Sequence, residues 1–300
     1  MSDLLEYAGV RLLEGAAGLL PRRAAERGGE LLGWLAHRPL GVRREVVAAQ
    51  IGRAFPDRSE DWVRATARAC YRHFGREFLA LARSGRIEPD DLLARTAHPH
   101  EVLGTWRSVV PEGSGGIVVT GHPGNWELAG ALLAALGLPV AAVVKRQRNA
   151  RFDRRLQRLR DRLGVEPVYM KEAARRLPAA LAEGKLVALV ADQDAGTRGV
   201  FVPFLGRPAS TFRGPARLAL RHGVPLVFGA LVRDGDGYRP VVSPVEPPSG
   251  GPDPERELTR RWVARFEEEI RRRPAQYFWF HRRWKTRPDG TGRETGSRDR

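Results

Sequence analysis

The first third of the chain repeats hydrophobic and polar residues with a helical period. Segments 4–20 and 24–37 carry leucines among small residues, and Pro21 separates them because proline ends a helix. The pattern continues over 42–83, where aromatic residues recur at helical spacing and indicate a packed core. We predict an N-terminal helical region from these segments and interpret 92–108 as a connection. Segment 4–20 fits either a helix packed on the protein or an interfacial membrane helix.

After residue 115 the pattern changes to short apolar runs. Residues 117–120 (Ile-Val-Val-Thr) predict a buried strand, followed by a tight loop and a helix at 126–136. The same strand pattern recurs at 140–144, 186–191 and 226–231, with helical stretches at 153–163, 173–183 and 215–221 between. This alternation predicts an α/β fold. The last expected elements are a helix at 262–272, an aromatic strand at 277–281 and a disordered Gly/Arg-rich tail at 288–300.

Composition and charge predict a folded protein with an anionic partner. The 300 residues are 42% hydrophobic, which is enough for one large core, and the formal net charge is +16. Residues 145–176 contain 12 Lys and Arg against 4 acids, and residues 256–300 contain 14 against 7. The positive excess is therefore local. Nucleic acid, an anionic lipid surface and an acidic carrier protein all satisfy it.

Cysteine content and hydropathy predict the compartment. Cys70 is the single cysteine, so neither an intramolecular disulfide nor a cysteine-based metal site is expected. No basic leader precedes an apolar run, and no apolar stretch reaches the roughly 18 residues that a membrane span needs. We expect a cytoplasm-facing protein that does not span a bilayer.

The candidate chemistry centres on His122. It lies where a strand is expected to end and a helix to begin, the usual place for functional groups in an α/β sheet. Asn125 is placed to cap the helix, so that Glu127 can fold back on the imidazole. A histidine held by a carboxylate is a general base, because the acid fixes its tautomer and stabilises the imidazolium. With no cysteine nearby and no Gly-x-Ser-x-Gly sequence, the pair is expected to activate a substrate hydroxyl for direct group transfer.

Four motifs occur in order along the chain. They are 121–127 (Gly-His-Pro-Gly-Asn-Trp-Glu), 192–194 (Asp-Gln-Asp), 200–211 (Val-Phe-Val-Pro-Phe-Leu-Gly-Arg-Pro-Ala-Ser-Thr) and 281–288 (His-Arg-Arg-Trp-Lys-Thr-Arg-Pro). Together they resemble the late acyltransferases of lipid A biosynthesis, the lauroyl and myristoyl transferases, within the lysophospholipid acyltransferase-like superfamily. The related mannoside acyltransferases of actinobacteria share the same core.

The resemblance implies a glycerol-3-phosphate acyltransferase-like fold: α/β, with a central mixed sheet flanked by helices and an N-terminal helical region. It also implies a His-x4-acid catalytic pair and an acyl-carrier protein or acyl-CoA thioester as donor. The acceptor that it implies is an anionic glycolipid at the cytoplasmic face of the bacterial inner membrane.

The resemblance assigns roles residue by residue. His122 looks like the general base, and Glu127 like its orienting partner. Arg160 matches a family arginine that binds phosphate or stabilises the thioester oxyanion, although a plain solvated arginine fits it equally. Asp192 matches a family acidic position, for which we expect a supporting role that braces Arg160 or the loop. Asp194 is its near-equivalent rival.

The remaining candidate substrate contacts are of two kinds. Phe201 and Phe204 are candidates for lining an acyl or lipid groove, although a hydrophobic turn in the core fits them equally. The polar candidates are Asn125, Lys145, Asp194, Arg282, Arg283 and Lys285. A solvated basic strand end fits the last three as well as a phosphate grip does. No metal or prosthetic group is expected.

These inferences divide the chain into an N-terminal helical, membrane-associating region (1–105), an α/β acyltransferase core (106–288) and a tail (289–300). Attachment to the membrane is expected to be peripheral or monotopic, because segment 4–20 is shorter and more charged than the apolar helix with which the family often begins.

Two questions stay open at this point. Residues 144–149 replace a Tyr-Arg-Pro-like stretch common in the lipid A enzymes, so a lipid A precursor, an inositol mannoside and glycerol phosphate all remain candidate acceptors. A basic nucleic-acid binder is the alternative class. No zinc-finger spacing, ribonucleoprotein aromatic signature or helix-turn-helix accompanies the arginines, so we expect no nucleic-acid partner.

Overall fold

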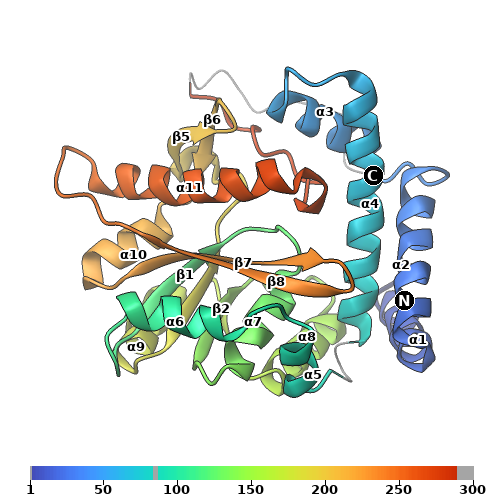
Figure 1. Cartoon of the computed structure of the whole chain (residues 1–300), viewed down its shortest axis with the longest axis horizontal. Coiled ribbons are helices and arrows are strands. Elements are labelled where there is room, and N and C mark those ends of the chain that lie inside the picture. Colours follow the sequence, from blue (N-terminus) through green and yellow to red (C-terminus); the bar gives the residue numbers. More distant parts are fainter. Residues whose placement is uncertain (1, 84–86, 289–300) are drawn as a thin grey trace.

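A six-stranded mixed sheet organises the protein, whose computed structural model describes residues 2–83 and 87–288 (Figure 1). Its strands are β1 (Gly116–Thr120), β2 (Val140–Val144), β3 (Val165–Tyr169), β4 (Leu186–Val190), β7 (Leu226–Asp234) and β8 (Gly237–Val245). The order is β3-β2-β4-β1-β7-β8, with β8 antiparallel to β7 and the other neighbours parallel. The predicted α/β fold with a mixed central sheet is confirmed.

Helices cover both faces of this sheet. Val118 and Leu186 face the side packed by α6 (His100–Val109) and α7 (Trp126–Ala135), and α8 (Ala150–Arg162) follows α7 along the chain. Ile117 and Val119 face the other side, where α9 (Ala173–Ala182), α10 (Gly214–His222) and α11 (Pro254–Arg272) pack. Because side chains alternate along a strand, one run of apolar residues supplies both cores.

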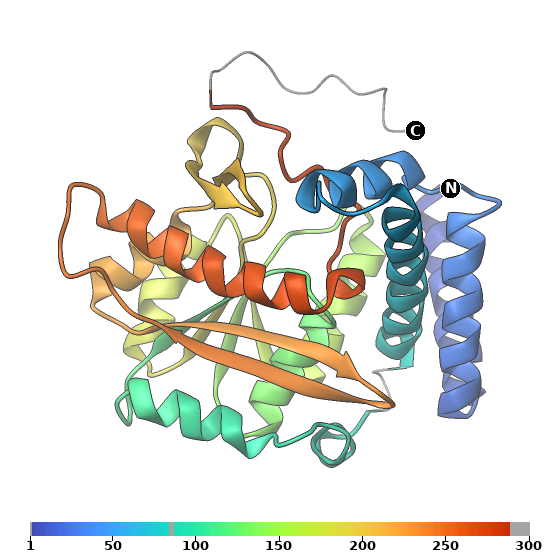
Figure 2. The same ribbon diagram turned by 45° about the horizontal axis from the view of Figure 1, so that its top comes forward.

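The N-terminal region is helical as predicted, and its first four helices stand beside one end of the sheet (Figure 2). It contains α1 (Ser2–Leu19), α2 (Arg22–His37), α3 (Arg44–Ala54), α4 (Glu60–Arg83) and α5 (Pro89–Ala94). Helices α2 and α4 lie side by side. They approach so closely that a Cβ at Gly33 would meet the backbone of Tyr71. Among the described helices, none is both long and apolar enough to cross a membrane.

Two expectations about secondary structure are wrong. Residues 92–108 are not a plain connection, since the end of α5 and most of α6 lie there. The division of the chain at residue 105, a position inside α6, stays a prediction. Residues 277–281 do not form a strand; only an isolated bridge joins Tyr277 to Pro123. Apart from Pro288, the expected tail lies outside the described residues.

A small hairpin of β5 (Val200–Phe204) and β6 (Arg207–Thr211) forms a separate two-stranded sheet. It packs against α11 and the C-terminal segment, and Phe204 is fully buried there. The hairpin therefore supports the second core rather than extending the main sheet.

Candidate active site

The loop after β1 has the strand–loop–helix geometry that the sequence predicted. Asn125 is the N-cap of α7, where its Oδ1 accepts a hydrogen bond from the backbone N–H of Leu128 at 3.0 Å. Gly124 has φ +62°, and a Cβ there would lie 2.1 Å from the carbonyl oxygen of Leu231. Only glycine fits this turn. The loop thus projects His122 from the carboxyl end of the sheet.

The imidazole of His122 is held by Asp192. Its Nδ1 lies 2.7 Å from Oδ1 of Asp192, and its backbone N–H donates to Oδ2 of the same carboxylate at 2.8 Å. Strands β1 and β4 are parallel neighbours in the sheet, so the residues that follow them meet. A Cβ at Gly121 would lie 2.8 Å from Cγ of Asp192 and 2.5 Å from a ring carbon of Phe266. The close approach of histidine and aspartate therefore requires glycine before the histidine.

Burial and charge together set the ionisation of this pair. The Asp192 side chain is fully buried and burial opposes its ionisation, but the charge and hydrogen bonds of His122 outweigh this and lower the pKa of Asp192 to about 2. Burial alone would lower the pKa of His122, yet the carboxylates of Asp192 and Glu127 raise it above its ordinary value. An ionised Asp192 fixes the proton on Nδ1, which leaves Nε2 able to accept one.

Glu127 pairs with Arg160 instead of His122. The Nε of Arg160 donates to Oε2 of Glu127 at 3.0 Å, and Nη2 donates to Oε1 at 2.5 Å. Both side chains are less than one-fifth exposed, and the fork geometry makes the pair strong. The expectation that Glu127 orients the imidazole is therefore corrected. Of the two supporting roles expected for Asp192, bracing Arg160 or the loop, the first does not occur. Asp192 does brace the loop, through the backbone N–H of His122.

Three expected substrate contacts are structural. Asn125 spends its Oδ1 on the helix cap and its Nδ2 on Glu77, 2.8 Å away. Phe204 is 0% exposed and packs among Phe266, Tyr277 and Trp284. Arg283 is 1% exposed; its guanidinium donates to the carbonyl of Ser210 and to the hydroxyl of Thr211. Asn125 and Arg283 therefore hydrogen-bond within the fold, and Phe204 packs in its core.

The other five candidates have different surroundings. Lys145 is exposed and lines the cavity described below. Asp194 accepts hydrogen bonds from the backbone and hydroxyl of Thr286, so it ties down the C-terminal segment. Phe201, Arg282 and Lys285 do not line the cavity.

Aromatic residues that the sequence analysis did not select surround the imidazole. The ring of Trp126 meets that of His122 edge to face at 4.5 Å, and the ring of Phe278 lies 5.8 Å away. The ring centre of His281 lies 6.5 Å from that of His122. Nε2 of His281 is 3.1 Å from the Tyr277 hydroxyl, and burial lowers the pKa of His281 to about 4. The sequence signal was present in the aromatic run 277–281, but it was interpreted as a strand.

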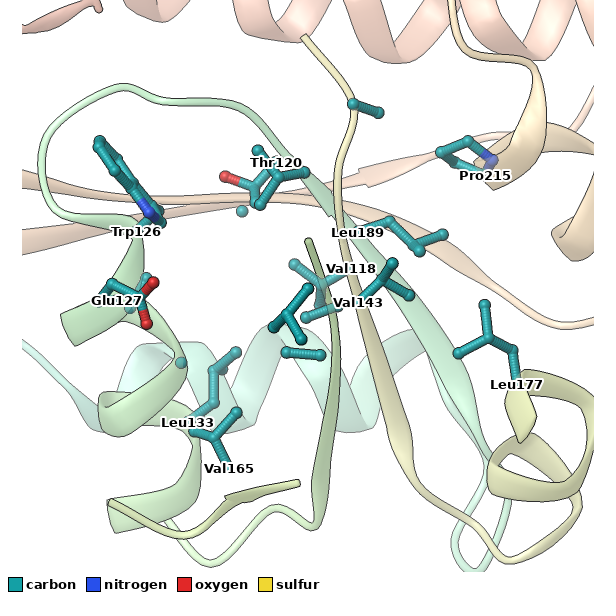
Figure 3. Close-up of a pocket in the computed structure, with 18 of the residues that line it drawn as sticks. Val118, Thr120, Trp126, Glu127, Leu133, Val143, Val165, Leu177, Leu189 and Pro215 are labelled. Carbon is teal, nitrogen blue, oxygen red and sulfur yellow. The ribbon is translucent and has the colours of Figure 1, made fainter. Parts of the chain in front are cut away.

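A cavity of about 1000 Å³ adjoins the histidine (Figure 3). His122, Glu127 and Arg160 contribute to its wall, and most of the remaining lining is aliphatic. Small residues keep it open: Gly130 on α7, Ala142 on β2 and Ala188 on β4. Figure 3 shows Glu127 and Trp126 above Leu133 and Val165, with Leu177 and Pro215 at the far side. A flexible apolar chain of fatty-acid length fits such a space.

The fold and this site define a class of protein: an α/β group-transfer enzyme with a carboxylate-held histidine beside an apolar cavity. Residues 3–286 match the family model of bacterial lipid A biosynthesis acyltransferases, so the chain belongs to this family and is an acyltransferase.

Several relatives cover most of the chain. The phosphatidylinositol mannoside acyltransferase of Mycolicibacterium smegmatis is 28% identical over 299 residues, covering 95% of this chain and 91% of that one. The lipid A biosynthesis palmitoleoyltransferase of Escherichia coli is 29% identical over 260 residues, 84% of this chain and 82% of that one. The lauroyltransferase of lipid A biosynthesis from the same species is 40% identical over 116 residues, 37% of each chain.

Proposed function

We propose that this protein transfers a fatty acyl group from an acyl thioester to a hydroxyl of an anionic glycolipid. The observation that carries the proposal is the position of His122. Its Nδ1 is bound to a buried, ionised Asp192, while the ring lines an apolar cavity large enough for an acyl chain. A general base beside an acyl-binding space is the arrangement that hydroxyl acylation needs.

The bonds and protons of the transfer balance without a cofactor. Nε2 of His122 takes the hydroxyl proton while the oxygen attacks the thioester carbonyl carbon. The C–O ester bond forms, the C–S bond breaks, and the imidazolium returns its proton to the leaving thiolate. Asp192 stabilises the imidazolium between these two proton transfers.

Arg160 is assigned to the negative charge that develops. Its Nη1 is buried and makes no hydrogen bond with any residue that the structure describes. Glu127 fixes the other edge of the guanidinium through two hydrogen bonds. A guanidinium held in this way can donate to a thioester oxyanion or to a substrate phosphate.

The donor's carrier group is assigned to a cationic surface on α8, the helix whose other side lines the cavity. We define the arginine face of α8 as Arg151, Arg154 and Arg158, all exposed and without ion pairs to the described residues. On α11, by contrast, glutamates pair with the arginines, as Glu257 does with Arg260 and Arg261. The arginine face thus carries uncompensated charge on the helix whose opposite side lines the cavity with Phe152, Leu156 and Arg160, and this charge suits an acidic carrier protein or the phosphates of CoA.

Peripheral binding to the cytoplasmic face of the inner membrane belongs to the same proposal. Leu4, Leu12 and Leu19 on α1 are 54%, 74% and 79% exposed, and their spacing places them along one side of the helix. An exposed apolar stripe on a helix that does not span the bilayer suits the membrane interface. Helix α1 also contacts α8 through the Arg155–Glu14 ion pair, so the helix that carries the stripe lies next to the helix that carries the arginine face.

Two acceptors are candidates, each suggested by a relative. A lipid A precursor is suggested by the Escherichia coli enzymes, and an inositol mannoside by the Mycolicibacterium smegmatis enzyme. Both acceptors present hydroxyls, on which His122 can act as a base, and phosphate groups, to which Arg160 can donate hydrogen bonds. The arrangement therefore suits both.

The test is acyl transfer from labelled acyl-carrier protein and acyl-CoA to a panel of both acceptor types, with the wild type and His122→Ala side by side. Transfer by the wild type that falls by about a hundredfold or more in the variant supports the proposal and names both substrates. Absence of transfer to every lipid, or equal transfer by both proteins, refutes it.

A further inference from the structure

A buried carboxylate from the N-terminal region reaches the loop that carries His122. Glu77, on α4, is 5% exposed, and its Oε2 accepts a hydrogen bond from Nδ2 of Asn125 at 2.8 Å. Asn125 lies three residues after His122 and two before Glu127. One side chain from outside the α/β core thus touches the middle of the candidate catalytic motif.

The contact determines how the Asn125 amide is oriented. Its Oδ1 must face the N–H of Leu128 to cap α7. A carboxylate only accepts hydrogen bonds, so Glu77 requires the NH2 group on its own side. With the amide fixed at both ends, the first turn of α7, and Glu127 within it, starts in one direction.

Glu77 is itself fixed by cations and donors. Nε of Arg233 donates to its Oε1 at 2.6 Å, and the hydroxyl of Tyr238 donates to Oε2 at 2.9 Å. Burial opposes ionisation of Glu77, but the charges of Arg233 and His73 outweigh it and lower its pKa. The carboxylate therefore stays charged and accepts from all three partners.

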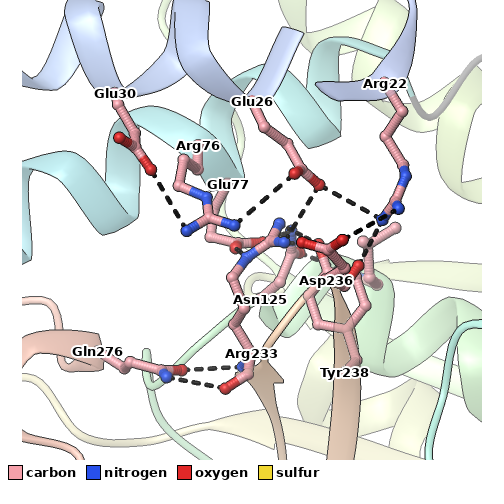
Figure 4. A network of polar contacts seen from close by, with 11 residues as sticks. Arg22, Glu26, Glu30, Arg76, Glu77, Asn125, Arg233, Asp236, Tyr238 and Gln276 are labelled. Atoms are coloured by element: carbon pink, nitrogen blue, oxygen red, sulfur yellow. Dashed lines mark hydrogen bonds and ion pairs between the residues drawn. The ribbon is translucent and has the colours of Figure 1, made fainter. Parts of the chain in front are cut away.

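The same network holds the loop from a second direction (Figure 4). Gln276 exchanges two hydrogen bonds with the backbone of Arg233, and its own carbonyl accepts from the N–H of Gly124 at 2.8 Å. Glu26 on α2 contacts Arg233 at 3.3 Å. Figure 4 shows Glu26 of α2, Glu77 of α4 and Arg233 and Tyr238 of the β7–β8 hairpin converging, with Gln276 on the other side of Arg233. The loop is therefore braced by side chains that do not line the cavity.

We propose that Glu77 is a positioning residue of the acyl transfer: through Asn125 it sets the placement of His122 and Glu127. This inference rests on the proposed function. It makes helix α4 part of the active-site framework in addition to any role in membrane association. Misplacement of a catalytic group by about 1 Å costs up to a hundredfold in rate. Loss of the hydrogen bond between Glu77 and Asn125 should therefore lower kcat.

The test exchanges donor and acceptor across the contact. In Glu77→Gln, the oxygen stays on Arg233 and an NH2 group faces the NH2 group of Asn125. In Asn125→Asp, the helix cap is kept but two carboxylates face each other. The double variant restores a hydrogen bond with its direction reversed, from the new amide to the new carboxylate. The control is Glu269→Gln on α11, which disturbs another buried glutamate, 1% exposed and paired with Arg273 just beyond the helix.

We expect each single variant to lower kcat by about tenfold or more, with KM for the donor changed less than about twofold, and the double variant to recover most of the loss. The control should lower the melting temperature without lowering kcat. If the single variants keep kcat and lose only melting temperature, as the control does, Glu77 is structural and the proposal is overturned. Equal loss in the single and double variants also overturns it.

A readout without substrate separates this proposal from the proposed function. Hydrogen exchange of residues 121–128 should be faster in both single variants and return towards the wild-type rate in the double variant. If the wild type transfers no acyl group, the proposed function fails. Unchanged exchange in the single variants then refutes the positioning role separately.

Discussion

Replacing Asp192 with asparagine tests the central assignment of this site, because it removes a charge while keeping the shape. Asp192 makes two contacts with His122, one to the ring and one to the backbone N–H. An amide can keep only one of them as an acceptor. If its NH2 group faces the ring, it donates to Nδ1, the proton moves to Nε2, and that nitrogen can no longer take a proton from the substrate.

The expected loss in kcat is between a hundredfold and ten-thousandfold, the range over which a general base contributes. This corresponds to about 3 to 5 kcal/mol of transition-state stabilisation, at roughly 1.4 kcal/mol per factor of ten. The comparison variant is Glu127→Gln, which keeps Asp192 on the histidine and breaks the bidentate pair with Arg160.

The dependence of rate on pH gives an independent measurement. A general base works in its neutral form, so kcat/KM should rise with pH through the pKa of His122, which the wild type holds above its ordinary value. Without the Asp192 charge, burial dominates and the pKa falls, so the rising limb should move to lower pH. If Asp192→Asn retains kcat within about tenfold and the limb does not move, while Glu127→Gln loses the limb, then Glu127 is the functional partner and our reasoning is wrong.

Three further predictions concern other parts of the site. Arg160→Lys keeps the charge but loses the planar fork by which two nitrogens bind Glu127, and we expect kcat/KM to fall about tenfold or more in the same transfer assay. Ala188→Leu fills part of the cavity beside Val118, so the preferred acyl chain should become shorter when donors of graded length compete. An unchanged chain preference would place the acyl group elsewhere. Reversing the charges of the arginine face of α8 should lower kcat/KM for the carrier-linked donor by about tenfold and weaken its dependence on salt. A control with the same change in net charge reverses three exposed arginines on other elements: Arg107, Arg198 and Arg207.

The sequence predicted the central strands better than the edge strands. β1, β2 and β4 are continuous apolar runs, because central parallel strands are buried on both faces. β3 and β8 were missed. Both lie at an edge of the sheet, and they contain Glu166 and Pro167, and Arg239 and Pro240, respectively, residues that obscure a strand pattern.

The sequence analysis selected the residues of the candidate site but not the pairs that they form. His122, Glu127, Arg160 and Asp192 were all selected, yet the expected partners were exchanged. His122 and Glu127 are close in sequence, whereas Asp192 is 70 residues from the histidine and meets it only because β4 lies next to β1. That neighbour relation is a property of the sheet order, which no local pattern encodes. Glu77 was missed for the same reason, since it contacts Asn125 across 48 residues.

The space at Gly121 has a consequence for how related sequences are sorted. A methyl group there would collide with Asp192 and Phe266, so even alanine would push the aspartate away from the imidazole. On the proposed function, we expect a homologue with alanine at this position to lose acyl transfer while it keeps His122, Glu127 and every other motif residue. The residue before the histidine, which takes no part in the proposed chemistry, would then separate active from inactive members of the same fold.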